Sequence, residues 1–107
     1  MTINEYQRLA QRTASTTTRG IKIENGIYGL CGESGECIDL WKKAVFQGHT
    51  LDETRLAEEL GDVLWYAAEL ATGLGVTLEE VMWRNIEKLR KRYPGGFDAE
   101  RSVHREE

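Results

Sequence analysis

Apolar residues recur every three or four positions along most of the chain, a spacing that predicts amphipathic α-helices. One such row runs through residues 24 to 47 and consists of Ile27, Leu30, Cys31, Ser34, Ile38, Trp41 and Val45. A second runs through residues 52 to 73 and consists of Leu56, Leu60, Val63, Ala67, Leu70 and Leu74. We interpret both rows as the core-facing stripes of two helices. The loop from Gly48 to Leu51 is short, so the two helices are expected to be antiparallel neighbours.

Further helices are predicted at about residues 3 to 14 and from Thr77 to about Arg92, before Pro94. Three segments have the form of a capping box, which marks a helix start: Thr2 to Glu5, Thr50 to Glu53 and Thr77 to Glu80. Gly73 and Gly75 are expected to end the 52–73 helix. The sequence therefore predicts an all-α, four-helix bundle-like single domain over residues 1–97, followed by a charged, frayed tail over 98–107.

Two glycine and threonine patterns leave alternatives open. Glycines at positions 26, 29, 32 and 35 lie inside the predicted 24–47 helix, where glycine costs stability. This spacing indicates close approach to the helix backbone, by either a neighbouring helix or a bound phosphate. The threonine-rich stretch from Thr13 to Gly20 is either a plain flexible loop or a mobile segment that closes over a ligand.

The 52–73 helix has a second apolar surface, formed by Ala57, Gly61, Trp65 and Ala68. A helix that is apolar on two sides is buried on two sides, which a small four-helix monomer cannot easily provide. We therefore expect a homodimer or homotetramer with Trp65 at the interface. Stacking of a nucleobase on Trp65 is the alternative interpretation.

Composition and charge narrow the classes of function. The chain has 107 residues and a net charge of −4, which favours neither nucleic acid nor an anionic membrane as partner. No apolar run is long enough to span a bilayer and no signal-peptide core is visible, so a cytoplasmic location is expected. Cys31 and Cys37 lie six residues apart on one predicted helix, roughly 9 Å along its axis, and cannot pair with each other. We interpret both as small buried residues, which fits a reducing compartment.

Two acidic pairs carry the candidate chemistry: Glu33 with Glu36, and Glu59 with Asp62. Residues three apart are neighbours on a helix surface. Each pair lies on the same rotational side of its helix's apolar row, at roughly 80–90° and 140–150° from the centre. In an antiparallel pair of helices, equal offsets of the same sense point to one side.

Four converging carboxylates repel one another and raise each other's pKa values unless a cation joins them. Oxygen ligands favour Mg²⁺, with Mn²⁺ as the second candidate. A single acidic pair beside an apolar row is usually only a solvated helix edge, but two matched pairs on antiparallel neighbours are a far less common coincidence. Redox iron is disfavoured, because no histidine follows a carboxylate by three residues.

Cationic and amide side chains that suit a polyphosphate lie elsewhere on the predicted helices. Asn85, Lys88 and Arg92 form one stripe on the last helix, and Lys43 follows Glu36 by seven residues. Basic residues in a last helical turn also complement the helix dipole, which is the simpler explanation for each one alone. Together they supply what metal-bound phosphates require.

At this point the sequence resembles the MazG-like all-α nucleoside triphosphate pyrophosphohydrolases, over about residues 3 to 97. Three segments carry the resemblance: Gly29 to Glu36, Glu58 to Tyr66, and Asn85 to Pro94. The resemblance implies Mg²⁺-dependent hydrolysis of a nucleoside triphosphate to the monophosphate and pyrophosphate, with a role in clearing the nucleotide pool. It implies metal binding by Glu33, Glu36, Glu59 and Asp62.

The resemblance also implies nucleotide contacts by Asn85, Lys88, Arg92, Tyr93 and Lys43, and assembly into dimers or tetramers. One of Glu33 and Glu36 is our candidate for the general base that orients the attacking water. Two alternatives remain open. The first is a related phosphoribosyl-ATP pyrophosphohydrolase, and the second is a non-catalytic helical module for dimerisation or regulation.

Overall fold

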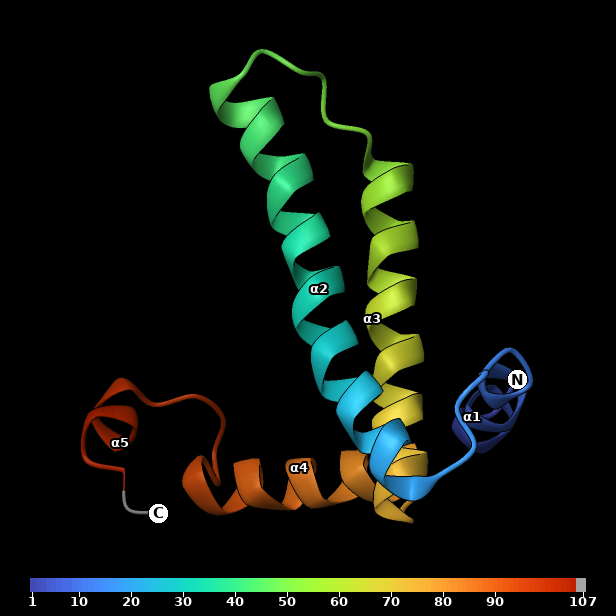
Figure 1. Cartoon of the computed structure of the whole chain (residues 1–107). Coiled ribbons are helices and arrows are strands. Elements are labelled where there is room, and N and C mark those ends of the chain that lie inside the picture. Colours follow the sequence, from blue (N-terminus) through green and yellow to red (C-terminus); the bar gives the residue numbers. More distant parts are fainter. Residues whose placement is uncertain (106–107) are drawn as a thin grey trace.

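The computed structural model describes residues 1–105, which form five α-helices joined by short connections (Figure 1). In chain order they are α1 Ile3–Gln11, α2 Arg19–Phe46, α3 Glu53–Leu74, α4 Leu78–Arg92 and α5 Ala99–Val103. Within residues 1–105 no β-strand is present, only an isolated bridge between Pro94 and Gly96. The predicted all-α fold class and its four main helices are confirmed.

Of the three predicted capping boxes, the one at Thr2 is present with both of its hydrogen bonds, and the one at Thr77 is present with one of them. The Thr2 hydroxyl accepts from the Glu5 amide at 3.0 Å and the Glu5 carboxylate accepts from the Thr2 amide at 3.4 Å. The Thr77 hydroxyl accepts from the Glu80 amide at 3.0 Å. The box predicted at Thr50 is wrong: the Asp52 carboxylate accepts from the Arg55 amide at 3.1 Å, so Asp52 caps α3. A carboxylate next to the first helical residue displaces the more distant threonine.

Two helix boundaries differ from the prediction. Helix α1 ends at Gln11, three residues before its predicted end. Helix α2 begins at Arg19, five residues before its predicted start, and the Thr18 hydroxyl accepts from the Ile21 amide. The side chain of Thr18 therefore starts α2 where the sequence suggested a loop. Gly75 ends α3 with φ of 76°, a left-handed conformation that glycine adopts without steric cost.

Helices α2 and α3 form a long antiparallel hairpin that is the centre of the molecule (Figure 1). Among the buried and half-buried residues of α2, one row recurs at three and four: Gly26, Leu30, Glu33, Cys37, Leu40 and Ala44. The corresponding row on α3 is Leu56, Glu59, Val63, Tyr66, Leu70 and Gly73. We call these two rows the hairpin seam. Two glutamates thus lie in the seam itself rather than beside it.

The predicted core stripe of α2 is wrong in its orientation. Ile27, Ile38, Trp41 and Val45 are exposed, Ile38 at 66% and Trp41 at 57%. Leu60 of the predicted α3 stripe is exposed at 58% as well. Cys31 is exposed and Cys37 only half-buried, so the two cysteines are not buried core residues. Helix α2 instead packs through the neighbouring row, which is rotated by about one residue, or roughly 100°. On α3 the prediction is largely correct, because Leu56, Val63 and Leu70 lie in the seam.

Small residues explain why this other row forms the seam. A Cβ at Gly26 would lie 2.7 Å from the Leu70 Cβ, and a Cβ at Gly29 would overlap the Tyr66 ring. A Cβ at Gly73 would lie 2.9 Å from the Ile23 Cγ1. The close approach indicated by the glycine spacing is therefore made by a neighbouring helix at positions 26 and 29. Added Cβ atoms at positions 32 and 35 would meet nothing within 4 Å among the described residues.

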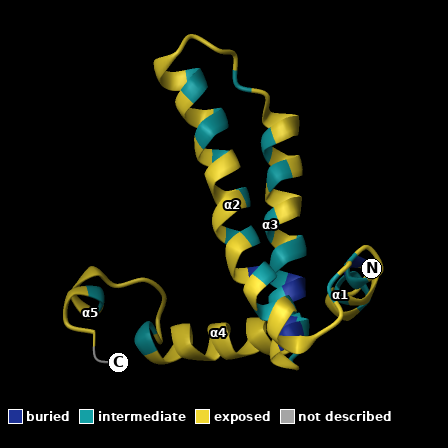
Figure 2. Cartoon of the chain, viewed as in Figure 1, coloured by how far each residue is buried: buried dark blue, intermediate teal, exposed yellow. Residues whose placement is uncertain are grey.

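Helix α1 packs against α3 at the base of the hairpin, where the most buried residues lie (Figure 2). The indole N–H of Trp65 donates to the Ala10 carbonyl at 3.0 Å and to the Thr13 hydroxyl at 2.9 Å. Ala68 is fully buried nearby. Helix α1 of the same chain therefore covers part of Trp65, which is half-buried, and a place for Trp65 at an interface between copies stays a prediction.

Helix α4 starts at the base of the hairpin and extends away from it, and α5 follows at its far end (Figure 1). Residues of α4 from Val81 to Lys91 are all exposed, including the apolar Met82, Ile86 and Leu89. The Cα radius of gyration is 17.0 Å, whereas a compact domain of this size has about 13 Å. The single chain is therefore open, with much of its apolar surface facing outward.

The segment after Pro94 is more ordered than the predicted frayed tail. The Asp98 carboxylate caps α5 by accepting from the amides of Glu100 and Arg101. No residue of α5 is buried. The final two residues of the predicted tail, 106 and 107, lie outside the described residues. No helix within the described part of the chain has the length and hydrophobicity needed to cross a membrane.

Candidate metal centre

Three of the four predicted carboxylates meet midway along the hairpin. Oxygen atoms of Glu33, Glu59 and Asp62 all lie within 4.8 Å of one another. Glu33 comes from the seam of α2 and Glu59 from the seam of α3, while Asp62 lies one helical turn after Glu59. Asp62 is exposed and the two glutamates are half-buried, so the group is open to solvent on one side. We call these three residues the acid cluster.

The electrostatics of the acid cluster show that its negative charges repel one another. A hydrogen bond with Glu59 raises the pKa of Glu33 above its ordinary value, and partial burial acts in the same direction. The charges of Asp62, Glu59 and Glu36 raise this pKa further. No ion pair within residues 1–105 joins the acid cluster to a basic side chain. The pKa of Glu33 is therefore raised by neighbours of its own charge, and a cation bound among these carboxylates would act in the opposite direction.

The fourth predicted carboxylate, Glu36, lies one turn along α2 and is exposed. It stands outside the group of three but close enough for its charge to act on Glu33. Glu36 and Lys43 line a cavity of about 230 Å³ near the tip of the hairpin, together with His49 and Arg55. Lys43 pairs with Asp39 at 2.9 Å, and this hydrogen bond lowers the pKa of Asp39. Glu36 and Lys43, which the sequence places on the same side of one helix, therefore line the same cavity.

The predicted contacts on α4 are not brought to the acid cluster within one chain. Asn85 and Lys88 are exposed on a helix that leaves the hairpin at its base, while the acid cluster lies midway along the hairpin (Figure 1). Sequence reasoning placed all of these residues beside one another because it assumed that α4 packs along α2 and α3. The short turn between α3 and α4, which begins at Gly75, directs α4 away instead.

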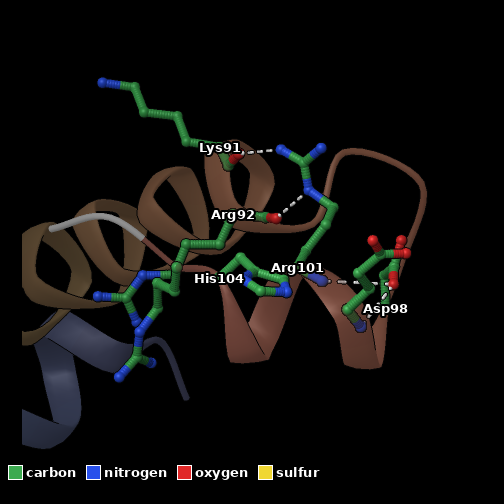
Figure 3. Close-up of a pocket in the computed structure, with 7 residues that line it drawn as sticks. Lys91, Arg92, Asp98, Arg101 and His104 are labelled. Atoms are coloured by element: carbon green, nitrogen blue, oxygen red, sulfur yellow. Dashed lines mark hydrogen bonds between the residues drawn. The ribbon is translucent and has the colours of Figure 1, made fainter.

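Arg92 and Tyr93 lie still further along, at the end of α4. Arg92 lines a cavity of about 710 Å³ between α4 and α5, and Figure 3 shows the side chains around it. The Arg101 guanidinium donates to the Arg92 carbonyl at 2.7 Å and to the Lys91 carbonyl at 3.5 Å, which satisfies carbonyls at the end of α4 (Figure 3). The ring of Tyr93 packs on Phe97 with centroids 5.4 Å apart.

Sequence reasoning missed two residues near the acid cluster. Burial raises the pKa of the Tyr6 phenol of α1, and the charge of Asp62 raises it further. Tyr66 follows Asp62 by one turn, and its ring contacts Trp65 edge-on with centroids 5.0 Å apart. A tyrosine in the first helix gives no signal in the sequence that α1 will be packed beside the acidic pairs.

With the geometry in place, comparison with known proteins identifies the family. The family model described as the MazG nucleotide pyrophosphohydrolase domain matches residues 21–97, which contain both acidic pairs and all of α2, α3 and α4 except the first two residues of α2. The chain belongs to the MazG family. The Gene 37 protein of Mycobacterium phage L5 is 40% identical to it over 105 residues, covering 90% of this chain and 92% of that protein. No solved structure matches the chain significantly.

The residues of this MazG chain fit a hard divalent cation. The acid cluster offers oxygen donors only, from carboxylates close enough to share one ion, and one side is open to solvent. The MazG family is divalent-metal dependent in general, which agrees with this donor set. Carboxylate oxygens at this spacing are ligands of the kind that Mg²⁺ and Mn²⁺ take.

Proposed function

We propose that this protein is an Mg²⁺-dependent nucleoside triphosphate pyrophosphohydrolase that converts an NTP or dNTP to the monophosphate and pyrophosphate. The observation that carries the proposal is the meeting of Glu33, Glu59 and Asp62 within 4.8 Å in a chain of the MazG family. Mn²⁺ is expected to replace Mg²⁺, because both take carboxylate oxygens. Removal of unwanted nucleotides from the pool is the corresponding role.

Each carboxylate has a proposed task. Glu33, Glu59 and Asp62 hold the metal, and Glu36 joins them from the next turn of α2. When bound, Mg²⁺ supplies positive charge to the phosphate oxygens and acidifies a water. Glu33 and Glu36 remain the candidates for the general base.

Basic residues are proposed to bind the phosphates that the metal does not neutralise. Lys43 lies with Glu36 on the cavity near the hairpin tip, which supports contact of its ammonium group with the pyrophosphate portion. Asn85, Lys88, Arg92 and Tyr93 are proposed to contact the nucleotide from α4. Because α4 extends away from the hairpin of its own chain, we infer that these four residues reach the acid cluster of a second copy.

Exposed apolar surface supports a homodimer or homotetramer. The α2 stripe of Ile27, Ile38, Trp41 and Val45 faces outward, and so do Met82, Ile86 and Leu89 of α4. At about 25 cal/mol per Å², burying such rows against another copy is strongly favourable. Opposite charges support the same arrangement, since basic residues dominate the end of α4 and carboxylates dominate the middle of the hairpin.

The test is a panel assay of pyrophosphate release over canonical and modified NTPs and dNTPs, with and without Mg²⁺. Release that requires the metal supports the proposal, and size-exclusion chromatography with light scattering gives the number of copies. Release from phosphoribosyl-ATP alone would instead assign the related pyrophosphohydrolase activity. No release from any triphosphate with Mg²⁺ or Mn²⁺ would leave a non-catalytic helical module. Mixing a Glu59→Gln chain with a Lys88→Ala chain should restore part of the activity if two copies share a site.

A further inference from the structure

The cavity near the tip of the hairpin lies between the last turns of α2 and the first turns of α3. Its volume is about 230 Å³, and it is lined by Glu36, Asp39, Leu40, Lys43, His49, Thr50, Asp52 and Arg55. We call it the tip cavity. Sites for small organic ligands usually have about 300–1,000 Å³ and mostly apolar walls. The tip cavity is smaller, and six of its eight lining residues are ionisable, so it suits a small, highly charged ligand.

The register of the hairpin places the tip cavity directly beyond the acid cluster. Gly29 of α2 meets the ring of Tyr66 of α3. Continued along the antiparallel helices, this register sets Glu36 level with Glu59 and places Arg55 one turn, or about 6 Å of rise, nearer the tip. Glu36 lines the tip cavity and lies one turn from the acid cluster on α2. A ligand that extends from the acid cluster towards the tip therefore passes Glu36 and enters this cavity.

The two aspartates of the tip cavity already have protein donors. Asp39 Oδ2 lies 2.9 Å from Lys43 Nζ, and Asp52 Oδ1 accepts from the Arg55 amide at 3.1 Å as the N-cap of α3. The positive end of the α3 dipole stabilises the charge of Asp52 further. The pair of Asp39 and Lys43 is half-exposed, and such pairs contribute little, so the ammonium group of Lys43 can turn to a phosphate.

The guanidinium of Arg55 lines the same cavity without a partner of its own. Its side chain makes no hydrogen bond or ion pair within residues 1–105, and Arg55 is the one basic residue of α3. A hydrogen bond from Lys43 lowers the pKa of Asp39, and the charge of Arg55 lowers it further, which agrees with a position of both cations on one cavity. A guanidinium presents a planar fork of donors that matches phosphate oxygens.

We propose that the tip cavity binds the pyrophosphate portion of the substrate and that Arg55 is a substrate-contacting residue whose guanidinium donates to its terminal phosphate oxygens. The phosphates that lie beyond the acid cluster then extend past Glu36 to Arg55 and Lys43. The inference rests on the proposed function for the identity of the ligand. It adds a contact from α3 that neither the acidic pairs nor the basic stripe of α4 includes.

The first measurement uses magnesium pyrophosphate as the probe, with its affinity obtained by calorimetry. Arg55→Gln should weaken pyrophosphate binding about tenfold, as expected for loss of a hydrogen bond between charged groups. Arg19→Gln is the matched control, because it removes the same charge from an exposed position at the opposite end of the hairpin. It should bind within twofold of the unmodified protein. Affinity of Arg55→Gln within twofold as well, or no binding by the unmodified protein, would overturn the assignment of Arg55.

Product inhibition tests which part of the substrate the tip cavity holds. With a nucleotide that the panel identifies, Arg55→Gln should weaken inhibition by pyrophosphate about tenfold. Inhibition by the nucleoside monophosphate should change less than twofold, because this product does not extend into the tip cavity. Equal weakening for both products would show that Arg55 acts only through its charge at a distance, and would overturn the assignment of the cavity to pyrophosphate.

The two proposals fail in different experiments. Pyrophosphate binding that depends on Arg55, without release from any nucleotide, would contradict the proposed function and leave the tip cavity as a pyrophosphate site. Release with an unchanged KM in Arg55→Gln, together with unchanged pyrophosphate affinity, would leave the proposed function standing and remove Arg55 from the site.

Discussion

The acid cluster and the Glu69 network, in which Gln11, Thr16, Lys22 and Asn25 all donate to the buried Glu69 carboxylate, use the same functional group for opposite purposes. In the acid cluster, carboxylates meet one another at a solvent-open part of the hairpin, and the pKa of Glu33 is raised. In the Glu69 network, one carboxylate is fully buried, and burial alone would raise its pKa. Four hydrogen bonds, from Asn25, Thr16, Gln11 and Lys22, outweigh burial and lower it. The difference lies in the partners: donors at the base of the hairpin, and other acids in its middle.

This comparison teaches which charged groups in a helical protein are available for chemistry. A carboxylate that already has its donors is a part of the fold, and removing it costs stability. Carboxylates held together without a cation cost stability as they stand, and a bound metal relieves that cost. Substitutions in the two regions should therefore separate activity from stability.

The largest effect is expected at the acid cluster. Asp62→Asn and Glu36→Gln should each lower turnover at least about 100-fold, because each removes a proposed charged metal ligand. The helical fold should persist, since neither side chain has a stabilising partner there. Pyrophosphate release and circular dichroism measure the two properties. Glu80→Gln, which breaks only a surface pair with Arg84, is the matched control. Near-normal turnover in Asp62→Asn would remove this residue from the site.

The second effect is a loss of stability at the Glu69 network. Glu69→Ala should lower the free energy of unfolding by about 3 kcal/mol, because it leaves Lys22 and three polar donors without their buried acceptor. Lys22→Met should cost less, since Glu69 keeps three hydrogen bonds. Urea denaturation measures both values. A larger loss for Lys22→Met than for Glu69→Ala would contradict the description of Glu69 as the centre of the network.

The two regions also differ in how far the sequence could predict them. The acidic pairs were visible because their spacing repeats on two helices with a short loop between them. The seam was not, because α2 carries two rows that could pack, and large apolar residues such as Ile38 and Trp41 made the outward row look like the core. Contact with Gly26 and Gly29 decides between the rows, and a glycine gives no hydrophobic signal.

Glu69 carried a signal that could have been used. It is the only charged residue between Asp62 and Glu79, in a stretch rich in alanine and leucine, where an isolated charge indicates a buried and paired group. Its partners could not be derived, because Gln11 and Thr16 precede α2 and their positions depend on how α1 turns back. The direction of α4 could not be derived either, since the turn after Gly75 sets it and helix periodicity does not.

A third substitution tests the boundary between the two regions. Gly29→Ala places a methyl group where the Tyr66 ring now lies, so the ring must move or the helices must separate. We expect a loss of about 2 kcal/mol from overpacking, measured by urea denaturation. Gly32→Ala is the matched control, because a Cβ there would meet nothing within 4 Å among the described residues, and alanine favours a helix. It should be neutral or stabilising in a monomer, and a loss at Gly32 would show that something else covers this face.

The smallest effect is a dependence of stability on pH that arises from Glu69. Its pKa is lower in the folded protein than in the unfolded chain, so its contribution is complete above the ordinary glutamate pKa and is lost as pH falls through the folded value. Lys22 is the charged group that faces it from α2. Gln11, Thr16 and Asn25 do not titrate.

The melting temperature of the protein should therefore change little with this group from pH 7 to pH 5 and fall below about pH 4.5. Glu69→Gln should show a smaller fall over the same range, and the difference between the two proteins isolates Glu69 from the other acids. Glu33 contributes in the opposite direction, because protonation relieves its repulsion from Glu59 and Asp62. An identical fall in both proteins would show that groups outside the Glu69 network cause the loss of stability in acid. It would also contradict a lowered pKa for Glu69 in the folded protein.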